Sequence, residues 1–241
     1  MASTFEGARA EVAAADRPPL RDTWPLRRAD VVVFVALFAG LTAVWTGIGL
    51  LLTGPLENSA LVRADQDVAE WFVDRRTPMR DDWATAGALL ADTFVKIIVT
   101  ALIAGLMLAI WRNWREPLMV AIPLVLEASV FITVTWLVGR PRPDVPRLED
   151  SPVASSFPSG HTAAAAAYSA VAVVVFWRFR SVWIRAAVVL VVVAIPIIVG
   201  VSRTYAGMHF LTDVVAGVLL GLASVLVVWI VLRHRQVTTR T

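Results

Sequence analysis

The chain has 241 residues, of which 58% are hydrophobic, and its mean hydropathy is +0.70. A soluble domain of this size would struggle to bury so many apolar residues, so the composition predicts a polytopic membrane protein. The formal net charge is +3, but the basic residues are scattered at the ends of apolar runs, which argues against a nucleic-acid partner. Cysteine is absent, which excludes disulfides, a thiolate nucleophile and thiolate metal ligands.

Hydropathy divides the chain into two tails and one domain. Residues 1–29 mix alanine, proline, arginine and acids without a period, and we expect a mostly disordered cytoplasmic tail that becomes helical near Trp24. Residues 233–241 form a basic cytoplasmic tail, and 30–232 form the six-span domain. Two of its apolar runs are short for a bilayer, so their helices should continue into flanking residues. The expected spans are 31–53, 93–111, 117–138, 162–177, 186–201 and 213–232.

The longest polar connection, 54–92, carries helical signals of its own. Apolar residues recur there at helical spacing while Asp65 and Asp67 face elsewhere, which predicts an extracytoplasmic interfacial helix between the first two spans. Thr77-Pro78, followed by acidic residues, predicts a second helix that continues into the next span. The predicted fold is therefore an all-α bundle of six transmembrane helices with one interfacial helix. The residues of the apolar stripe are Leu61, Ala64, Val68, Trp71 and Phe72.

The distribution of arginines predicts how the bundle is oriented. With this span assignment, thirteen arginines lie on the side of both termini and eight lie on the other side. Four of those eight belong to three polar clusters, at 139–143, 158–161 and 202–213, or to the loop between them. Because cytoplasmic loops are enriched in basic residues, both termini should be cytoplasmic and the three clusters extracytoplasmic.

The clusters hold two histidines and a carboxylate. His209 and Asp213 are four positions apart at the start of the sixth span, so on a helix their side chains can meet. A carboxylate there can hold one imidazole nitrogen as N–H and leave the other as a nucleophile. His161 opens the fourth span at a matching depth and can act as a general acid.

The same clusters have the composition of an anion pocket. Ser159 and Gly160 precede a helix N-terminus, where free backbone N–H groups favour an anion. Arg142 and Arg203 can clamp phosphoryl oxygens. Pro141 should prevent Arg140 from pointing into the same site as Arg142.

Glycines at positions 217 and 221 lie on the face of the sixth span that carries Asp213. Small residues at this spacing favour close helix packing in membranes. We expect them to seat the sixth span against the alanine-rich fourth span.

The three clusters together resemble the signature of the type-2 phosphatidic acid phosphatase family. That signature is a Lys, six residues and Arg-Pro; then Pro-Ser-Gly-His; then Ser-Arg, five residues, His, three residues and Asp. The second part is matched at 158–161 and the third by Ser202, Arg203, His209 and Asp213. Arg142-Pro143 matches the first part, but its lysine position is occupied by Thr135.

The resemblance implies a role for each matched residue. His209 would form a phosphohistidine, Asp213 would orient it, and His161 would protonate the leaving group. The phosphate-binding set would be Arg142, Ser159, Gly160 and Arg203. No cofactor and no metal ion is implied. Lys96 either replaces the missing lysine as an accessory residue or pairs with Glu127 inside the membrane.

Other classes of function are also compatible with parts of the pattern. His161, His209 and Asp213 have the composition of a two-histidine, one-carboxylate iron site, although the arginines would repel a cation. A lipid-phosphate binder or transporter would need the basic residues but not a His-Asp pair. Vanadate-dependent haloperoxidases share the constellation but are soluble. A homo-oligomer is an open alternative.

The sequence therefore predicts an integral membrane phosphatase that acts on a lipid phosphate or diphosphate at the extracytoplasmic face. The family resemblance and the outward-facing site make undecaprenyl diphosphate, the bacterial cell-wall carrier, the first candidate substrate, which implies a bacterial plasma membrane. Phosphatidic acid and phosphatidylglycerol phosphate are the alternatives. The sequence does not separate the three lipids, because selectivity for the lipid tail depends on how the spans pack and on residues 54–92.

Overall fold

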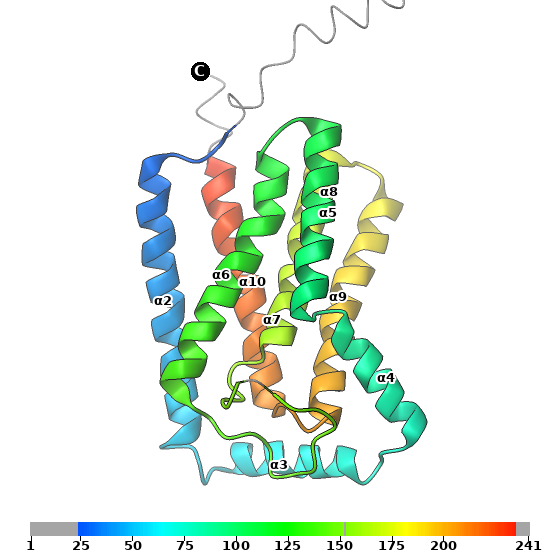
Figure 1. The fold of residues 1–241 in the computed structure, drawn as a ribbon. Coiled ribbons are helices and arrows are strands. Elements are labelled where there is room, and N and C mark those ends of the chain that lie inside the picture. Colours follow the sequence, from blue (N-terminus) through cyan, green and yellow to red (C-terminus); the bar gives the residue numbers. More distant parts are fainter. Residues whose placement is uncertain (1–23, 152, 235–241) are drawn as a thin grey trace, which may run out of the picture.

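The structure is a computed structural model that describes residues 24–151 and 153–234 (Figure 1). All regular structure in these two ranges is helical, which confirms the predicted all-α class. The tail predicted for 1–29 lies mostly outside the described residues, as do positions 235–241, and the first described helix begins at Arg28 rather than near Trp24. The helices are α2 (Arg28–Thr53), α3 (Ala60–Val73), α4 (Pro78–Leu89), α5 (Thr93–Trp111), α6 (Arg115–Val138), α7 (Gly160–Ala167), α8 (Ser169–Arg178), α9 (Val182–Tyr205) and α10 (Leu211–His234).

Six helical stretches of the described chain are long and apolar enough to cross a membrane, as predicted. The fourth consists of α7 and α8, which are separated only by Tyr168. The two short apolar runs do extend into motif residues, since α7 includes His161 and α9 includes Ser202 and Arg203. Residues of the second and third polar clusters therefore lie within the ends of the membrane helices. The six stretches are Arg28–Thr53, Thr93–Trp111, Arg115–Val138, Gly160–Arg178, Val182–Tyr205 and Leu211–Arg233.

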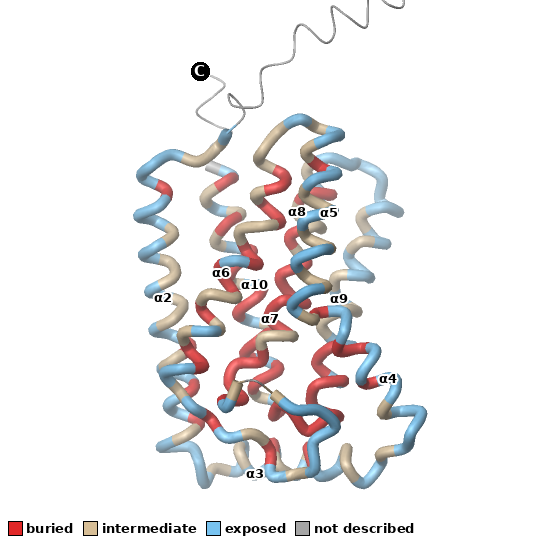
Figure 2. The backbone as a smooth tube through the Cα atoms, in the orientation of Figure 1, coloured by how far each residue is buried: buried red, intermediate tan, exposed pale blue. Residues whose placement is uncertain are grey.

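The centre of the bundle is the alanine-rich helix α7. Its side chains from Ala163 to Ala167 are at most 1% exposed, and the contact between α7 and α10 is the most extensive between two helices of the described chain. Small side chains allow this approach because the two backbones can come nearly into contact. The outer helices α2 and α5 are mostly exposed along their apolar lengths, as expected of surfaces that face lipid (Figure 2).

Helix α3 lies across one end of the bundle, beneath α7 and α10 (Figure 1). Ser59 caps its N-terminus by accepting a hydrogen bond from the Val62 N–H at 3.3 Å. The predicted placing of Asp65 away from the apolar stripe is wrong, because Asp65 is buried and lines the same groove as Leu61, Ala64 and Val68. A carboxylate is turned inward because it finds charged and backbone donors there.

Helix α4 begins at Pro78 with Thr77 as its cap, as the sequence predicts. Its predicted continuation into the next span is wrong, because α4 ends at Leu89 and α5 starts separately at Thr93. The Asp92 side chain accepts a hydrogen bond from the Phe94 N–H at 2.9 Å and caps the new helix. The chain can therefore change direction between α4 and α5, as Figure 1 shows.

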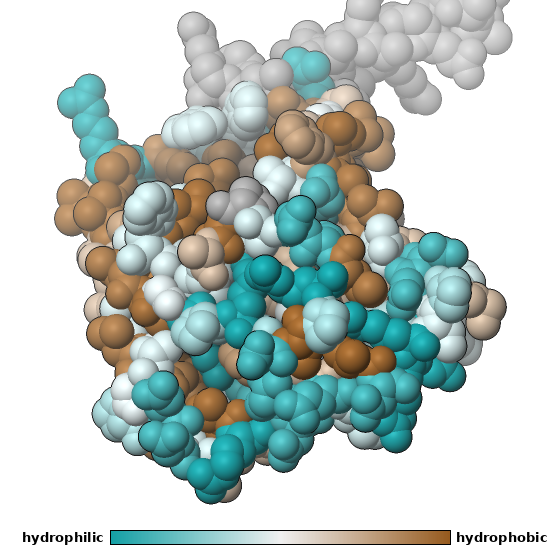
Figure 3. Space-filling view, turned by 60° about the horizontal axis from the view of Figure 1, so that its bottom comes forward, coloured by the Kyte–Doolittle hydropathy of each residue, from teal (hydrophilic) through white to brown (hydrophobic). Residues whose placement is uncertain are grey.

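The two ends of the bundle differ in polarity. The loops 139–159 and 206–210 and helix α3 lie together at one end, and hydrophilic residues cover much of that end (Figure 3). The start of α2 and the end of α10 lie at the opposite end (Figure 1). All three polar clusters therefore share one end of the bundle, away from both ends of the described chain.

Candidate active site

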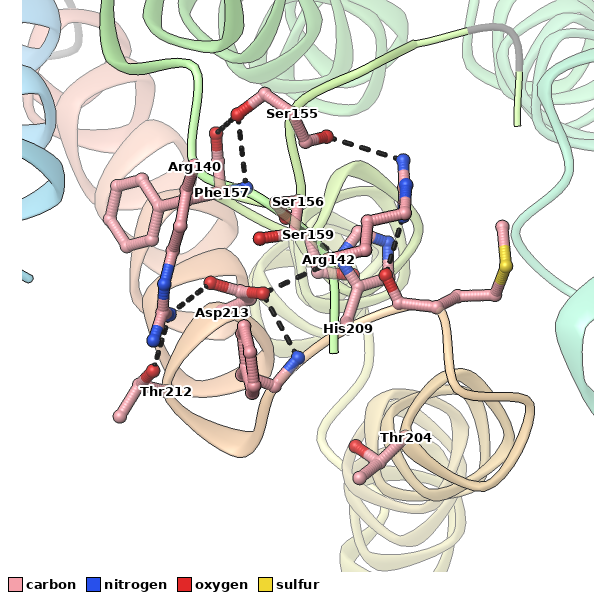
Figure 4. Close-up of polar contacts among 12 residues, drawn as sticks. Arg140, Arg142, Ser155, Ser156, Phe157, Ser159, Thr204, His209, Thr212 and Asp213 are labelled. Carbon is pink, nitrogen blue, oxygen red and sulfur yellow. Dashed lines mark hydrogen bonds and ion pairs between the residues drawn. The ribbon is translucent and has the colours of Figure 1, made fainter. Parts of the chain in front are cut away.

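His209 lies in the short loop between α9 and α10 and is 5% exposed. Gly207, with a φ of +72°, supplies the left-handed turn that takes the chain out of α9. The His209 Nδ1 atom lies 2.7 Å from the carbonyl oxygen of Ser156 (Figure 4). A carbonyl oxygen only accepts, so Nδ1 must carry the proton, and Nε2 of the neutral ring then has a free lone pair.

The partner that orients His209 differs from the predicted one. His209 is not on a helix, and its Nδ1 is 3.9 Å from Asp213 Oδ2, which is too long for a hydrogen bond. Asp213 instead accepts a hydrogen bond from the Phe210 N–H at 2.9 Å and pairs with Arg140 at 2.5 Å. The Ser156 carbonyl, a backbone group brought in by a loop, holds the ring in place of the carboxylate.

His209 is also kept neutral by its surroundings. Burial, reinforced by the nearby guanidinium groups of Arg203 and Arg142, holds the pKa of His209 well below its usual value of 6.5. A neutral imidazole with its Nδ1 proton fixed is the form that can attack through Nε2.

His161 lies in the first turn of α7 and shares the site with His209. The two imidazoles are close enough to influence each other electrostatically. The charged groups that act on His161 are those of Arg203, Asp92, Lys96 and Arg142. The structure therefore brings together both predicted histidines and both predicted phosphate-binding arginines.

Arg142 reaches the site from the loop after α6, but much of its guanidinium is already used. Nη2 donates to the Ser151 hydroxyl at 2.7 Å and to the Val153 carbonyl at 2.9 Å, and Nη1 donates to the Met208 carbonyl. Burial and the positive charges of Arg203 and Arg147 lower the pKa of Arg142 to about 10, so it stays charged at neutral pH. Arg142 thus holds its own loop against the residue that precedes His209.

Several buried donors around the histidines keep hydrogen-bonding capacity. Arg203 pairs with Glu149 through Nη1 at 2.5 Å. Within the described chain, Nε of Arg142, Nε of Arg203 and Oγ of Ser159 have no hydrogen-bond partner. Polar groups are costly to bury without a hydrogen-bond partner, and an oxyanion can accept hydrogen bonds from donors of these kinds.

The Ser159-Gly160 turn joins the second and third clusters. The Ser159 N–H donates to the backbone carbonyl of Asp213 at 3.0 Å, and the Ser159 hydroxyl does not cap α7. A Cβ on Gly160 would meet the Phe131 ring at 3.0 Å, so glycine is needed for packing at this point. The N-terminus of α7 is therefore held directly against the start of α10.

Thr135, which occupies the lysine position of the family signature, does not take over the role of a lysine. Thr135 is buried, and its hydroxyl has no hydrogen-bond partner among the described residues. Lys96 pairs with the fully buried Glu127 at 3.1 Å, which is the pairing alternative predicted from the sequence. Its ammonium is thus committed to a carboxylate, although its charge still acts on His161.

Sequence reasoning assigned no role in the site to Arg140 or to Asp65. Arg140 points away from Arg142, as expected from Pro141 between them, and lies on the Asp213 side of the site (Figure 4). Asp65 pairs with Arg140 at 3.1 Å from the other side. The one signal that could have revealed Arg140 is its place on the side of the bundle that should be poor in positive charge.

A metal site is not formed by these side chains. Among residues 24–151 and 153–234, no three histidine or carboxylate side chains are grouped closely enough to hold a metal ion. The two-histidine, one-carboxylate arrangement considered from composition is therefore not assembled in this structure.

With this geometry established, two comparisons decide the family. The family model described as the PAP2 superfamily matches residues 117–236. Phosphatidylglycerophosphatase B of Bacillus subtilis is 31% identical over 178 residues, which cover 72% of this chain and 85% of that protein. The chain belongs to the PAP2 superfamily. The resemblance drawn from the three clusters is thereby confirmed.

Two solved structures share the fold of this chain. A transmembrane PAP2 type phosphatidylglycerolphosphate phosphatase from Bacillus subtilis superposes with a TM-score of 0.66 at 24% identity, covering 78% of this chain and 93% of that one. LpxE of Aquifex aeolicus gives a TM-score of 0.51 at 26% identity, covering 67% and 92%. The PAP2 match begins at residue 117, so α3, which carries Asp65, lies outside it.

Proposed function

We propose that this PAP2 protein is a membrane-embedded phosphatase that removes phosphate from a lipid phosphate through a phosphohistidine at His209. The observation that carries the proposal is the 2.7 Å contact between His209 Nδ1 and the Ser156 carbonyl, which leaves Nε2 as an available nucleophile. Arg142 and Arg203 act electrostatically on His209, and each keeps an Nε without a hydrogen-bond partner among the described residues, as does the Ser159 hydroxyl. A non-catalytic lipid binder would have no use for an imidazole held in this tautomer.

The proposed reaction has two steps. In the first, His209 Nε2 attacks phosphorus, the bond from phosphorus to the lipid oxygen breaks, and His161 gives its proton to that oxygen. In the second, water attacks the phosphohistidine while His161 takes up a proton, and inorganic phosphate leaves. The arginines and Ser159 stabilise charge on the non-bridging oxygens. Because their positive charge already serves this purpose, we propose a metal-independent reaction.

The substrate we favour is phosphatidylglycerol phosphate. The support is the similarity to phosphatidylglycerophosphatase B of Bacillus subtilis. Undecaprenyl diphosphate, the first candidate from the sequence, and phosphatidic acid are the alternatives within the same chemistry.

Phosphate release across a panel of lipid phosphates tests the assignment. We expect the purified protein to hydrolyse phosphatidylglycerol phosphate with a higher kcat/KM than undecaprenyl diphosphate or phosphatidic acid, and His209→Ala serves as the blank. A higher kcat/KM for undecaprenyl diphosphate would show that this lipid, and not phosphatidylglycerol phosphate, is the preferred substrate. No release from any lipid by the folded wild-type protein would contradict the enzyme assignment.

We also propose that the site faces the extracytoplasmic side and that α3 lies along that membrane interface. The asymmetric distribution of arginines supports this orientation. Because the chain has no cysteine, single cysteines report topology without background. We expect Asp67→Cys on α3, but not Asn113→Cys before α6, to react with a membrane-impermeant maleimide applied to intact cells. The reverse pattern would invert the orientation.

A further inference from the structure

Asp65 on α3 is a buried carboxylate whose two oxygens are both used. Its side chain is 3% exposed. Oδ1 accepts a hydrogen bond from the Thr212 N–H at 3.0 Å, and Oδ2 accepts from Arg140 Nη2 at 3.1 Å and from the Thr212 hydroxyl. Asp65 therefore binds both the first turn of α10 and the loop that follows α6.

Arg140 continues this chain of contacts to Asp213. Its Nη1 donates to Asp213 Oδ1 at 2.5 Å and to the Thr212 hydroxyl at 2.7 Å (Figure 4). The same guanidinium lies over the Phe210 ring, 4.3 Å from its centroid. One buried arginine thus joins two carboxylates and packs on the residue next to His209.

Asp213 in turn contacts both backbone segments that carry the reactive groups. Its Oδ2 accepts from the Phe210 N–H at 2.9 Å, directly after His209 in the chain. Its carbonyl oxygen accepts from the Ser159 N–H at 3.0 Å, two residues before His161. Any displacement of Asp213 would therefore move the nucleophile loop and the N-terminus of α7 relative to each other.

The contribution of Asp65 is to orient the Arg140 guanidinium and not to balance its charge. Arg140 alone is sufficient to neutralise Asp213, so a second carboxylate is not needed for charge balance. Asp65 instead fixes where the guanidinium lies, since it holds Nη2 while Asp213 holds Nη1. A planar fork held at both ends has one orientation, which a single ion pair would not impose.

We propose that Asp65 is a positioning residue for the catalytic site, acting through Arg140 and Asp213 on the placement of His209. This inference rests on the proposed phosphatase function. Among the described residues, the hydrogen-bond and ion-pair partners of Asp65 are Arg140 and Thr212, neither of which belongs to the predicted phosphate-binding set. Asp65 is supplied by a helix outside the segment that the PAP2 family model matches. Helix α3 is therefore part of the catalytic apparatus as well as a cover for the end of the bundle.

Asp65→Asn tests the proposal, because the amide keeps an oxygen for the Thr212 N–H but loses the charge that holds Arg140. We expect kcat to fall about 10- to 100-fold, since small displacements of reacting groups have effects of this size. KM and the inhibition constant of inorganic phosphate should stay within about two-fold, because the anion donors are untouched. Asp67→Asn is the matched control: it makes the same change at an exposed position of the same helix and should leave kcat within about two-fold.

Hydrogen exchange over residues 209–214 supplies a second measurement that does not need turnover. Exchange there should be faster in Asp65→Asn than in Asp67→Asn, while the buried part of α7 from Ala164 to Ala167 should exchange equally in both. Equal kcat in the two variants would overturn the positioning role, and so would a joint loss of phosphate inhibition and of the thermal transition, which indicates general unfolding. If wild-type protein hydrolyses no lipid, the proposed function fails, and equal exchange in the two variants would then overturn the positioning separately.

Discussion

Phosphate release should fall by about 10³-fold or more when His209 is replaced by alanine, because the variant has no group that can form the phosphohistidine. The structure gives this residue a fixed tautomer through the Ser156 carbonyl and neutral charge through burial. Both conditions must hold for Nε2 to attack. Steady-state release of inorganic phosphate from the best lipid of the panel measures the effect.

Chemical trapping separates this role from a structural one. Wild-type protein quenched during turnover with labelled lipid phosphate should carry a phosphoryl group that is stable to alkali and labile to acid, and His209→Ala should carry none. The thermal transition of the variant in detergent shows whether it remains folded. Retention of a tenth or more of the wild-type rate by a folded variant would place the nucleophile elsewhere.

Much of the site could be predicted because its residues lie in sequence next to the ends of the apolar runs. A helix that begins at a polar cluster projects that cluster from its own end, so the order of apolar runs was enough to bring His161, Arg203 and His209 to one end of the bundle. The spacing of Gly217 and Gly221 also predicted that this face packs against the fourth span. A Cβ on Gly221 would lie 2.9 Å from the Ala167 nitrogen, which shows how closely α10 and α7 approach.

What could not be predicted depends on contacts between distant segments. The Ser156 carbonyl that orients His209 is a backbone group in a loop. Every residue has such a carbonyl, so the sequence does not indicate which one contacts the histidine. Asp65 was placed on the polar face of α3 because periodicity cannot tell a solvated carboxylate from one that meets a buried arginine. The break between α4 and α5 coincides with Asp92, whose side chain caps α5, and apolar periodicity alone does not predict where such a cap interrupts a helix.

The tight contact of α10 with α7 predicts a second large effect. Gly217→Ala would place a Cβ onto the Ser159 carbonyl and the Thr162 hydroxyl, and Gly221→Ala would place one onto the Ala163 carbonyl. Backbone atoms cannot move aside as a flexible side chain can, so each substitution should destabilise the protein by about 1–3 kcal/mol. Because Ser159 is displaced by the first, Gly217→Ala should also lower kcat, by about 10²-fold. Thermal unfolding in detergent and phosphate release measure the two effects.

Gly105→Ala on α5 and Gly47→Ala on α2 are matched controls, since a Cβ at either position would meet nothing within 4 Å. In these open helical positions alanine is the better helix former, so stability should be unchanged or higher by up to about 1 kcal/mol. The contrast isolates the helix contact from any general effect of losing a glycine. If all four variants unfold at the same temperature, the α7 and α10 backbones are not in contact in the membrane. If Gly221→Ala alone loses stability while Gly217→Ala keeps full activity, the placement of Ser159 does not depend on this contact.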